Sequence, residues 1–126
     1  MPVSFEPLLY AICIGKERFS LSQIDKSGVF VVNFMPFKYK DDVLYCGRHS
    51  GKVIDKFERT SLTKADAEAV DCCAVNEAVA WIECQVIDRK EYGDHVVFIG
   101  SILNVKENKN LKRLFHIKGD KFTTTK

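Results

Sequence analysis

The feature that most constrains the fold is a pair of long β-rich runs, at Val79 to Lys90 and at His95 to Lys106. A short segment, Glu91-Tyr92-Gly93-Asp94, separates them and contains the turn formers Gly and Asp. Strands joined by so short a turn must pair antiparallel, because a parallel crossover needs a dozen or more residues. The sequence therefore predicts a long antiparallel hairpin.

Two apolar runs upstream predict further strands. Leu8 to Ile14 is continuously apolar, as expected of a core strand covered on both faces. Val29 to Phe34 is a second buried strand, and Met35-Pro36 ends it because proline lacks a ladder donor. With no strict βαβ alternation, the pattern favours a mainly β, antiparallel barrel with helical excursions over a doubly wound parallel sheet.

Short helices are expected between these strands. Ser20, with Gln23 three residues later and Gly28 behind, forms a capping-box pattern that predicts a helix over Leu21 to Ser27. Further short helices are expected at Lys38 to Cys46 and, after a polar break at residues 47–51, at Lys52 to Glu58. Residues 60–76 show little periodicity and are expected to form a loop with at most one helical turn.

Composition narrows the class of protein. A chain of 126 residues, 46% hydrophobic, fits one compact domain. Its net charge of +2 argues against an extended nucleic-acid surface. No apolar stretch has the length of a membrane-spanning helix. The five cysteines have no C-x-x-C spacing and mostly lie in apolar runs, which favours a reducing cytoplasm. The cysteines and the three isolated histidines do not have the spacing of a metal site.

The segment Gly15-Lys16-Glu17-Arg18-Phe19-Ser20 leaves a predicted strand and enters a predicted helix. Unpaired backbone N–H groups at a helix start, together with Arg18, Lys16 and the Ser20 hydroxyl, suit a phosphate dianion. The alternative is that Ser20 only caps the helix while both cations are solvated. Spacing alone leaves both interpretations open.

A second glycine-containing segment is Cys46-Gly47-Arg48-His49-Ser50-Gly51-Lys52, followed by Asp55-Lys56-Phe57. Glycines allow close approach of a ligand to the backbone, and Arg48, Lys52 and Lys56 add positive charge. The spacing is not that of a Walker A loop, and an ordinary turn explains the segment as well.

Two residues are candidates for catalysis. His49 near Cys46 suggests an activated thiol, although no orienting partner is recognisable. His95, in Gly93-Asp94-His95, could contact a carbonyl or carboxamide, but a solvated turn histidine is the commoner case.

Taken in order, these segments resemble the flavin reductase-like, FMN-binding split-barrel family, which includes flavoredoxins and ferric reductases. Coverage is nearly the whole chain. The matching pieces are Pro2-Val3-Ser4-Phe5-Glu6-Pro7-Leu8, Gly15-Lys16-Glu17-Arg18-Phe19-Ser20, Ser27-Gly28-Val29-Phe30-Val31-Val32-Asn33, Leu44-Tyr45-Cys46-Gly47, Ser50-Gly51-Lys52 with Asp55-Lys56-Phe57, Gly93-Asp94-His95, and Leu114-Phe115-His116-Ile117-Lys118-Gly119.

The resemblance implies FMN at a homodimer interface, with the phosphate at Arg18 and Ser20 and with Ser50, Gly51 and Lys56 nearby. It implies that residues 2–4 run along the isoalloxazine ring, and that Cys46 and His95 face the flavin or nicotinamide. The expected cofactor-binding set is Pro2, Val3, Ser4, Lys16, Arg18, Ser20, Gly47, Ser50, Gly51, Lys52 and Lys56.

The sequence departs from the family pattern at its start, where two further strands are expected upstream of Pro2. We therefore expect either a longer protein or a partner chain that covers the edge of the strand at Leu8 to Ile14.

The leading functional hypothesis is an FMN-dependent oxidoreductase that moves reducing equivalents between NAD(P)H, flavin and an acceptor. The alternatives are a non-enzymatic FMN-binding electron carrier or flavin store, and a flavin-free interaction domain.

Overall fold

The computed structural model describes residues 1–50, 55–107, 114–118 and 121–124. Its main sheet has five strands in the order β1-β2-β7-β6-β3, and each neighbouring pair is antiparallel. The strands are β1 (Pro2–Phe5), β2 (Leu8–Gly15), β3 (Val29–Phe34), β6 (Ala80–Tyr92) and β7 (His95–Glu107). The mainly β, antiparallel architecture expected from the sequence is confirmed.

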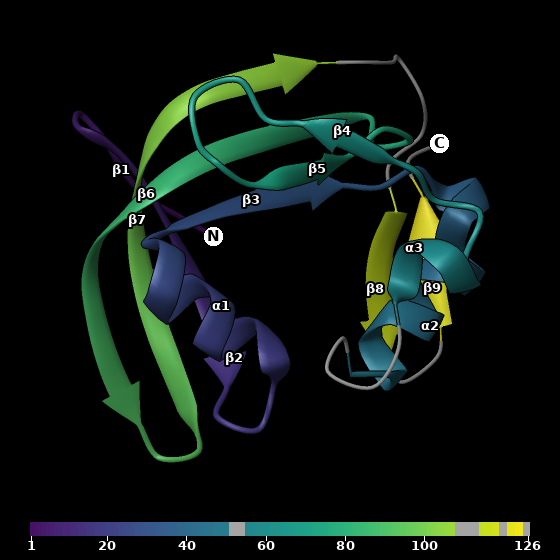
Figure 1. The fold of residues 1–126 in the computed structure, drawn as a ribbon, viewed down its shortest axis with the longest axis horizontal. Coiled ribbons are helices and arrows are strands. Elements are labelled where there is room, and N and C mark those ends of the chain that lie inside the picture. The colour runs from purple at the N-terminus through teal and green to yellow at the C-terminus, as the bar shows by residue number, and fades with distance from the viewer. Residues whose placement is uncertain (51–54, 108–113, 119–120, 125–126) are drawn as a thin grey trace.

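The hairpin of β6 and β7 forms the centre of the sheet, as predicted. Tyr92 pairs with His95 across the turn, where Gly93 adopts a φ of 59°, a conformation that favours glycine. Register shifts lie between Glu83 and Cys84 and between Val86 and Asp88. Bulges of this kind bend a strand and increase its twist, in keeping with the strong curve of the hairpin in Figure 1.

Helix α1 (Phe19–Ser27) lies within the curve of the sheet (Figure 1). Its residue Ile24 is buried in the main core, and Gly28, at a φ of 71°, ends it as expected. The predicted cap is wrong, however: the N-cap is Arg18, no side chain caps the helix, and Ser20 lies in its first turn. The buried core residues around Ile24 are Phe30, Ile82, Cys84, Val96 and Phe98.

Strand β2 differs from its prediction. Tyr10, Ile12 and Ile14 pack against the main core, but no residue of β2 is fully buried, and Leu8 and Cys13 are exposed. The expectation of full cover on both faces is therefore wrong within the described chain: on the face opposite the core, Leu9 and Ala11 are only partly buried and Cys13 is exposed. Strand β1 pairs with the edge of β2 opposite β7, so residues 2–5 of this chain cover that edge.

A small hairpin replaces the loop expected at residues 60–76. Strands β4 (Lys64–Asp66) and β5 (Cys73–Val75) pair antiparallel. Ala74, Ala78 and Trp81 form a second buried cluster, with Val31 and Met35 packed against it. By the alternation of the strands, Val31 and Trp81 lie on the face of the sheet opposite the main core. The hairpin thus supplies a second, smaller core.

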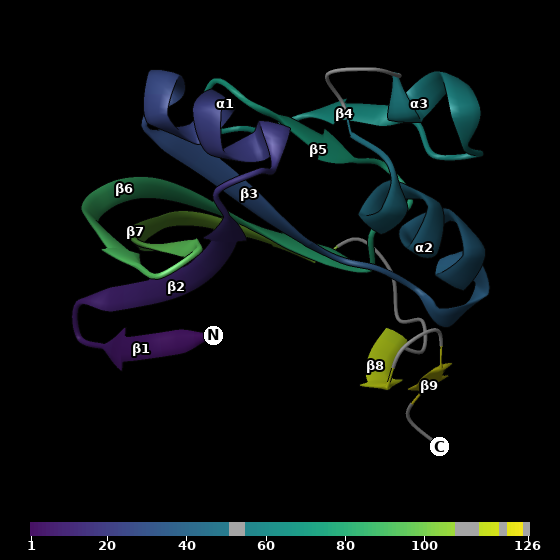
Figure 2. The ribbon, with the colours of Figure 1, turned by 90° about the horizontal axis from the view of Figure 1, so that it is seen from below.

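The remaining elements lie at one end of the sheet (Figures 1 and 2). They are the 3₁₀ helix η1 (Phe37–Tyr39), α2 (Lys40–Arg48), α3 (Lys56–Arg59), β8 (Leu114–Lys118) and β9 (Lys121–Thr124). The expected helix at Lys38 to Cys46 corresponds to η1 and α2, although α2 continues through Gly47 and Arg48, where a break was predicted. The expected helix start at Lys52 falls outside the described residues, and α3 begins at Lys56.

Among the described residues, no helix combines the length and the apolar character that crossing a membrane requires.

Candidate functional site: a cationic cleft at the start of α1

A cleft of about 550 Å³ lies where the start of α1 meets the segments that follow α2. Its volume is within the range of small-molecule sites. Cationic, hydroxyl and aromatic side chains contribute to the lining, so the cleft offers both charge and apolar surface. The lining residues are Glu17, Arg18, Phe19, Ser20, His49, Ser50, Lys56, Phe57 and Cys73.

Three of these side chains donate to consecutive carbonyl groups in the last turn of α2. Nδ1 of His49 lies 2.8 Å from the Tyr45 oxygen, Nζ of Lys56 lies 2.7 Å from the Cys46 oxygen, and Nη1 of Arg18 lies 3.0 Å from the Gly47 oxygen. Carbonyls at a helix C-terminus lack intrahelical partners and carry partial negative charge, so they attract cationic donors. The end of α2 therefore gathers the cations of the cleft and fixes their positions.

Both cations keep donor capacity beyond these bonds. An arginine has five N–H donors and a lysine ammonium has three, and the bonds to α2 engage one N–H of each side chain. A ligand anion can therefore bind the same Arg18 and Lys56 without displacing them from α2. Cations held in place in this way lose less conformational entropy when a ligand binds.

The start of α1 adds backbone donors. Phe19 and Ser20, in the first turn, line the cleft, and this turn contains neither a side-chain cap nor an acidic residue. The N–H groups of an uncapped first turn, at the positive end of the helix dipole, bind anions. Among the described lining residues Glu17 is the one carboxylate, so positive groups outnumber negative ones.

The loop that carries Arg18 is attached to the tip of the β6–β7 hairpin. The Lys16 N–H donates to the Asp94 oxygen at 2.9 Å, and the Lys16 side chain forms an ion pair with Glu91 at 3.5 Å. Arg18 itself closes a turn, its N–H donating to the Gly15 oxygen at 3.0 Å. Lys16 thus supports the site through the hairpin and does not line the cleft.

His49 was considered in the sequence only as a partner for a thiol, and the structure gives it a different setting. A carbonyl oxygen only accepts hydrogen bonds, so Nδ1 of His49 carries the hydrogen and Nε2 is the other ring nitrogen. The ring stacks on Tyr45, with centroids 3.9 Å apart and planes at 21°. The i to i+4 spacing of Tyr45 and His49 at a helix end was the sequence signal for this contact.

Cys46 does not have the surroundings of an activated thiol. Burial raises the pKa of its thiol, Lys56 lowers it and Asp42 raises it further, and the net pKa lies above the ordinary value. Reactive cysteines have lowered pKa values. A raised pKa does not support the activated-thiol interpretation, which stays a prediction; in the structure Cys46 contributes its backbone carbonyl, which holds Lys56.

Of the expected cofactor-binding residues, Arg18, Ser20, Ser50 and Lys56 line the cleft, and Gly47 borders it through its carbonyl. Gly51 and Lys52 lie outside the described residues. Residues 2–4 form β1 and do not line this cleft.

His95 does not line the cleft either; its half-exposed ring contacts the Asp94 carboxylate at 2.7 Å. The histidine lowers the pKa of Asp94.

The cleft also contains residues that sequence reasoning did not select. Glu17 and Phe19 belong to the segment singled out around Arg18, and Phe57 follows Lys56 directly, so local proximity was a usable signal. Cys73 lay in the predicted loop, and nothing in its local sequence indicated that β5 would bring it to the cleft.

Comparison with known proteins agrees with this fold. A family model described as "Flavin reductase like domain" matches residues 1–125. An uncharacterised protein of Archaeoglobus fulgidus is 35% identical over 98% of this chain and 76% of its own length. A flavin reductase of Pseudomonas putida is 30% identical over 90% of this chain and 64% of its own length.

A solved structure of an FMN-binding protein from Thermus thermophilus superimposes with a TM-score of 0.89 and 24% identity, covering 98% of this chain and 73% of the other. The split-barrel expectation for the fold is thus confirmed, and the chain belongs to the flavin reductase-like family.

Proposed function

We propose that the cationic cleft binds the phosphate of FMN and that the protein is an oxidoreductase, which moves reducing equivalents between NAD(P)H, flavin and an acceptor. The observation that carries this proposal is the convergence of Arg18 and Lys56 with an uncapped helix start in one cleft. Family membership supports a flavin as the ligand, and the FMN-binding protein of Thermus thermophilus supports FMN in particular.

The donor set suits a phosphate monoester. Such a group carries nearly two negative charges at neutral pH and has three acceptor oxygens. Arg18 and Lys56 supply charge, Ser20 supplies a hydroxyl, and the first turn of α1 supplies backbone N–H groups. Phe19 and Phe57 provide apolar surface for the uncharged part of the ligand.

In this proposal the flavin, when bound, supplies the hydride and electron-transfer chemistry. The chain binds the phosphate, orients the cofactor and limits water around it. Arg18 and Lys56 hold fixed positions because the carbonyls of α2 restrain them, so the phosphate end serves as the anchor from which the ring is oriented. This role needs no acid–base pair from the protein.

We also propose a homodimer in the cytoplasm. Leu103 and Val105 on β7 are 48% and 54% exposed, and Cys13 on β2 is exposed as well. Exposed apolar side chains on the sheet favour association, and a second copy is the partner that the family resemblance implies. All five cysteines are free thiols, in keeping with a reducing compartment. Sedimentation that shows a monomer with full FMN affinity would contradict the dimer.

The electron-carrier alternative keeps the phosphate site but needs no nicotinamide pocket. NAD(P)H oxidation by the protein with added FMN distinguishes the two functions, and visible absorbance of the purified protein reports whether flavin is bound. We expect flavin bands and FMN-dependent NAD(P)H oxidation. Flavin bands without oxidation would favour the carrier, and no affinity for flavin would contradict both.

A further inference from the structure

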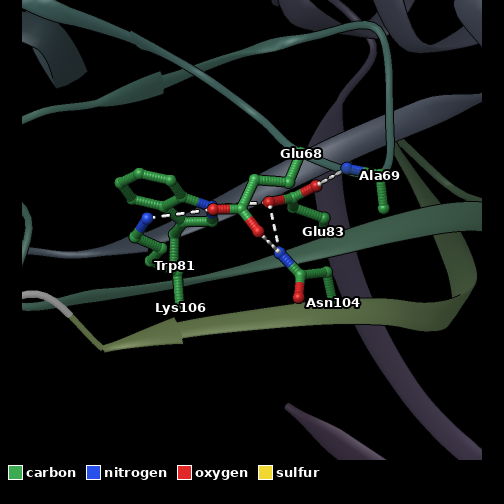
Figure 3. A network of polar contacts seen from close by, with 6 residues as sticks. All are labelled: Glu68, Ala69, Trp81, Glu83, Asn104 and Lys106. Carbon is green, nitrogen blue, oxygen red and sulfur yellow. Dashed lines mark hydrogen bonds and ion pairs between the residues drawn. The ribbon is translucent and has the colours of Figure 1, made fainter.

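Glu83 is a buried carboxylate outside the cleft. It lies on β6 with an exposed fraction of 0%, among the apolar residues of the sheet. Figure 3 shows donors from three directions converging on it. Its Oε1 accepts from the Ala69 N–H at 2.5 Å, and its Oε2 accepts from Nε1 of Trp81 at 2.8 Å and Nδ2 of Asn104 at 2.9 Å.

These donors keep Glu83 ionised. Burial by itself raises the pKa of a carboxyl group, but hydrogen bonds from the Ala69 N–H, Trp81, Asn104 and the Glu68 N–H lower the pKa of Glu83 to about 2. A buried charge of this kind is a poor source of net stability, because its desolvation offsets most of the gain. Its use lies in specifying one arrangement of the groups around it.

The arrangement concerns the segment that joins β4 to β5. Ala69 is in this segment and is exposed, so its bond to Glu83 ties the outside of the small hairpin to strand β6 of the main sheet. Residue Cys73 at the start of β5 lines the cleft. Residues 69–73 of this segment therefore connect the backbone that Glu83 binds with the wall of the cleft.

Other contacts hold the base of the hairpin. The Val75 N–H donates to Oδ1 of Asn33 at 2.9 Å, and the small buried cluster packs beneath Ala74. The Glu68 carboxylate pairs with Lys106 at 2.9 Å at the surface. The bond from Ala69 thus ties the part of the segment farthest from the base of the hairpin to the buried carboxylate of Glu83.

We propose that Glu83 is a positioning residue for the cleft: its Oε1 holds Ala69 and thereby fixes the wall that carries Cys73. The consequence for ligand affinity rests on the proposed flavin function, whereas the consequence for the wall does not. Because Cys73 contributes to the shape of the cleft and carries no positive charge, displacement of this wall affects FMN and riboflavin alike.

The substitution Glu83→Gln tests this role because it keeps the shape of the side chain. Glutamine has one acceptor oxygen, which meets the two side-chain donors Trp81 and Asn104, and its NH₂ group then faces the Ala69 N–H. The bond to the segment is therefore the one that is lost. Glu68→Gln is the matched control, since it weakens the exposed contacts of the same segment with Lys106 and Asn104, which contribute little, and leaves the bonds from Ala69 and Trp81 to Glu83 in place.

Amide hydrogen exchange measures the wall directly. In Glu83→Gln we expect exchange at Ala69 and its neighbours up to Cys73 to become about tenfold faster, with α1 and β7 unchanged. We expect the dissociation constants of FMN and riboflavin, measured well below the melting temperature, to rise together by about tenfold. In Glu68→Gln both readouts should stay near the wild-type values.

Unchanged exchange at Ala69 in Glu83→Gln would overturn the proposal, as would a loss of affinity confined to FMN. If Glu83→Gln does not fold, Ala69→Pro removes the same hydrogen bond from the exposed side and should give the same pattern; unchanged exchange at residues 70–73 in that variant would equally contradict it. A wild-type protein that binds neither flavin would refute the proposed function, while the exchange experiment still decides the role of Glu83.

Discussion

The cationic cleft and the Glu83 network both contain charged groups, but they differ in how much of the hydrogen-bonding capacity of those groups is used within the protein. Arg18 and Lys56 each bond one carbonyl of α2 and keep further donors. Glu83 has both carboxylate oxygens engaged and no exposed surface. Charged groups that keep unused hydrogen-bond donors in an open cleft suit ligand binding. A buried carboxylate whose two oxygens both have partners suits the fixing of structure.

The largest effect is expected when the buried Glu83 carboxylate is removed. Glu83→Ala leaves the Ala69 N–H and Trp81 without their acceptor, leaves Asn104 with only its 3.4 Å contact to Glu68, and opens a cavity. We expect the free energy of unfolding to fall by about 3 to 5 kcal/mol. Chemical denaturation measures it, and a loss below about 1 kcal/mol would show that these donors find other partners.

The same carboxylate predicts sensitivity to acid. Its pKa is lowered to about 2 from an ordinary value of 4.5, so the folded state holds its proton less tightly than the unfolded state does. The stabilisation is fully present above pH 4.5 and is lost as pH falls through the folded pKa of about 2. We expect a loss on the order of 3 kcal/mol over that window. In Glu83→Gln the loss should be visibly smaller; equal acid profiles would assign the sensitivity to other carboxyls.

In the cleft, removal of one cation should affect binding and leave the fold intact. We expect Arg18→Ala to weaken FMN binding by about 1.5 to 3 kcal/mol and to change riboflavin binding little, because only FMN carries the phosphate. Lys26→Ala is the matched control, since Lys26 is a cation in the last turn of the same helix. Equal losses for both ligands would show that Arg18 does not contact the phosphate.

The smallest effect is expected for an exposed ion pair that belongs to neither region. Asp25 on α1 pairs with Arg89 on β6 at 2.8 Å, with both side chains 38% exposed. We expect Asp25→Asn to lower the free energy of unfolding by less than about 1 kcal/mol. A larger loss in denaturation would mean that this pair does more to hold α1 on the sheet than its exposure indicates.

The strands were predictable where local signals mark their ends. Val29–Phe34 matches its prediction because Gly28 needs a positive φ and Pro36 lacks the N–H that would continue the ladder. Strands β4 and β5 were missed because each has three residues, and contacts distant in sequence, such as that between Ala69 and Glu83, hold their hairpin. Short strands of this kind leave no periodicity to detect.

Within the candidate site, sequence reasoning selected the Arg18 and Lys56 segments but not the group that organises them. The carbonyls at the end of α2 carry no side-chain signature, so their part emerged only from the folded geometry. The expected Ser20 cap was wrong for a related reason: α1 begins at Phe19, and its first turn stays uncapped toward the cleft.

The measurement that tests the central claim most directly is a titration of the wild-type protein with FMN and with riboflavin, followed by flavin fluorescence. The two ligands differ only in the phosphate, which is the group that the cationic cleft is proposed to bind. We predict that FMN binds at least about tenfold more tightly, the equivalent of one charge-assisted hydrogen bond. Equal affinities for the two flavins, or no affinity for either, would contradict the account.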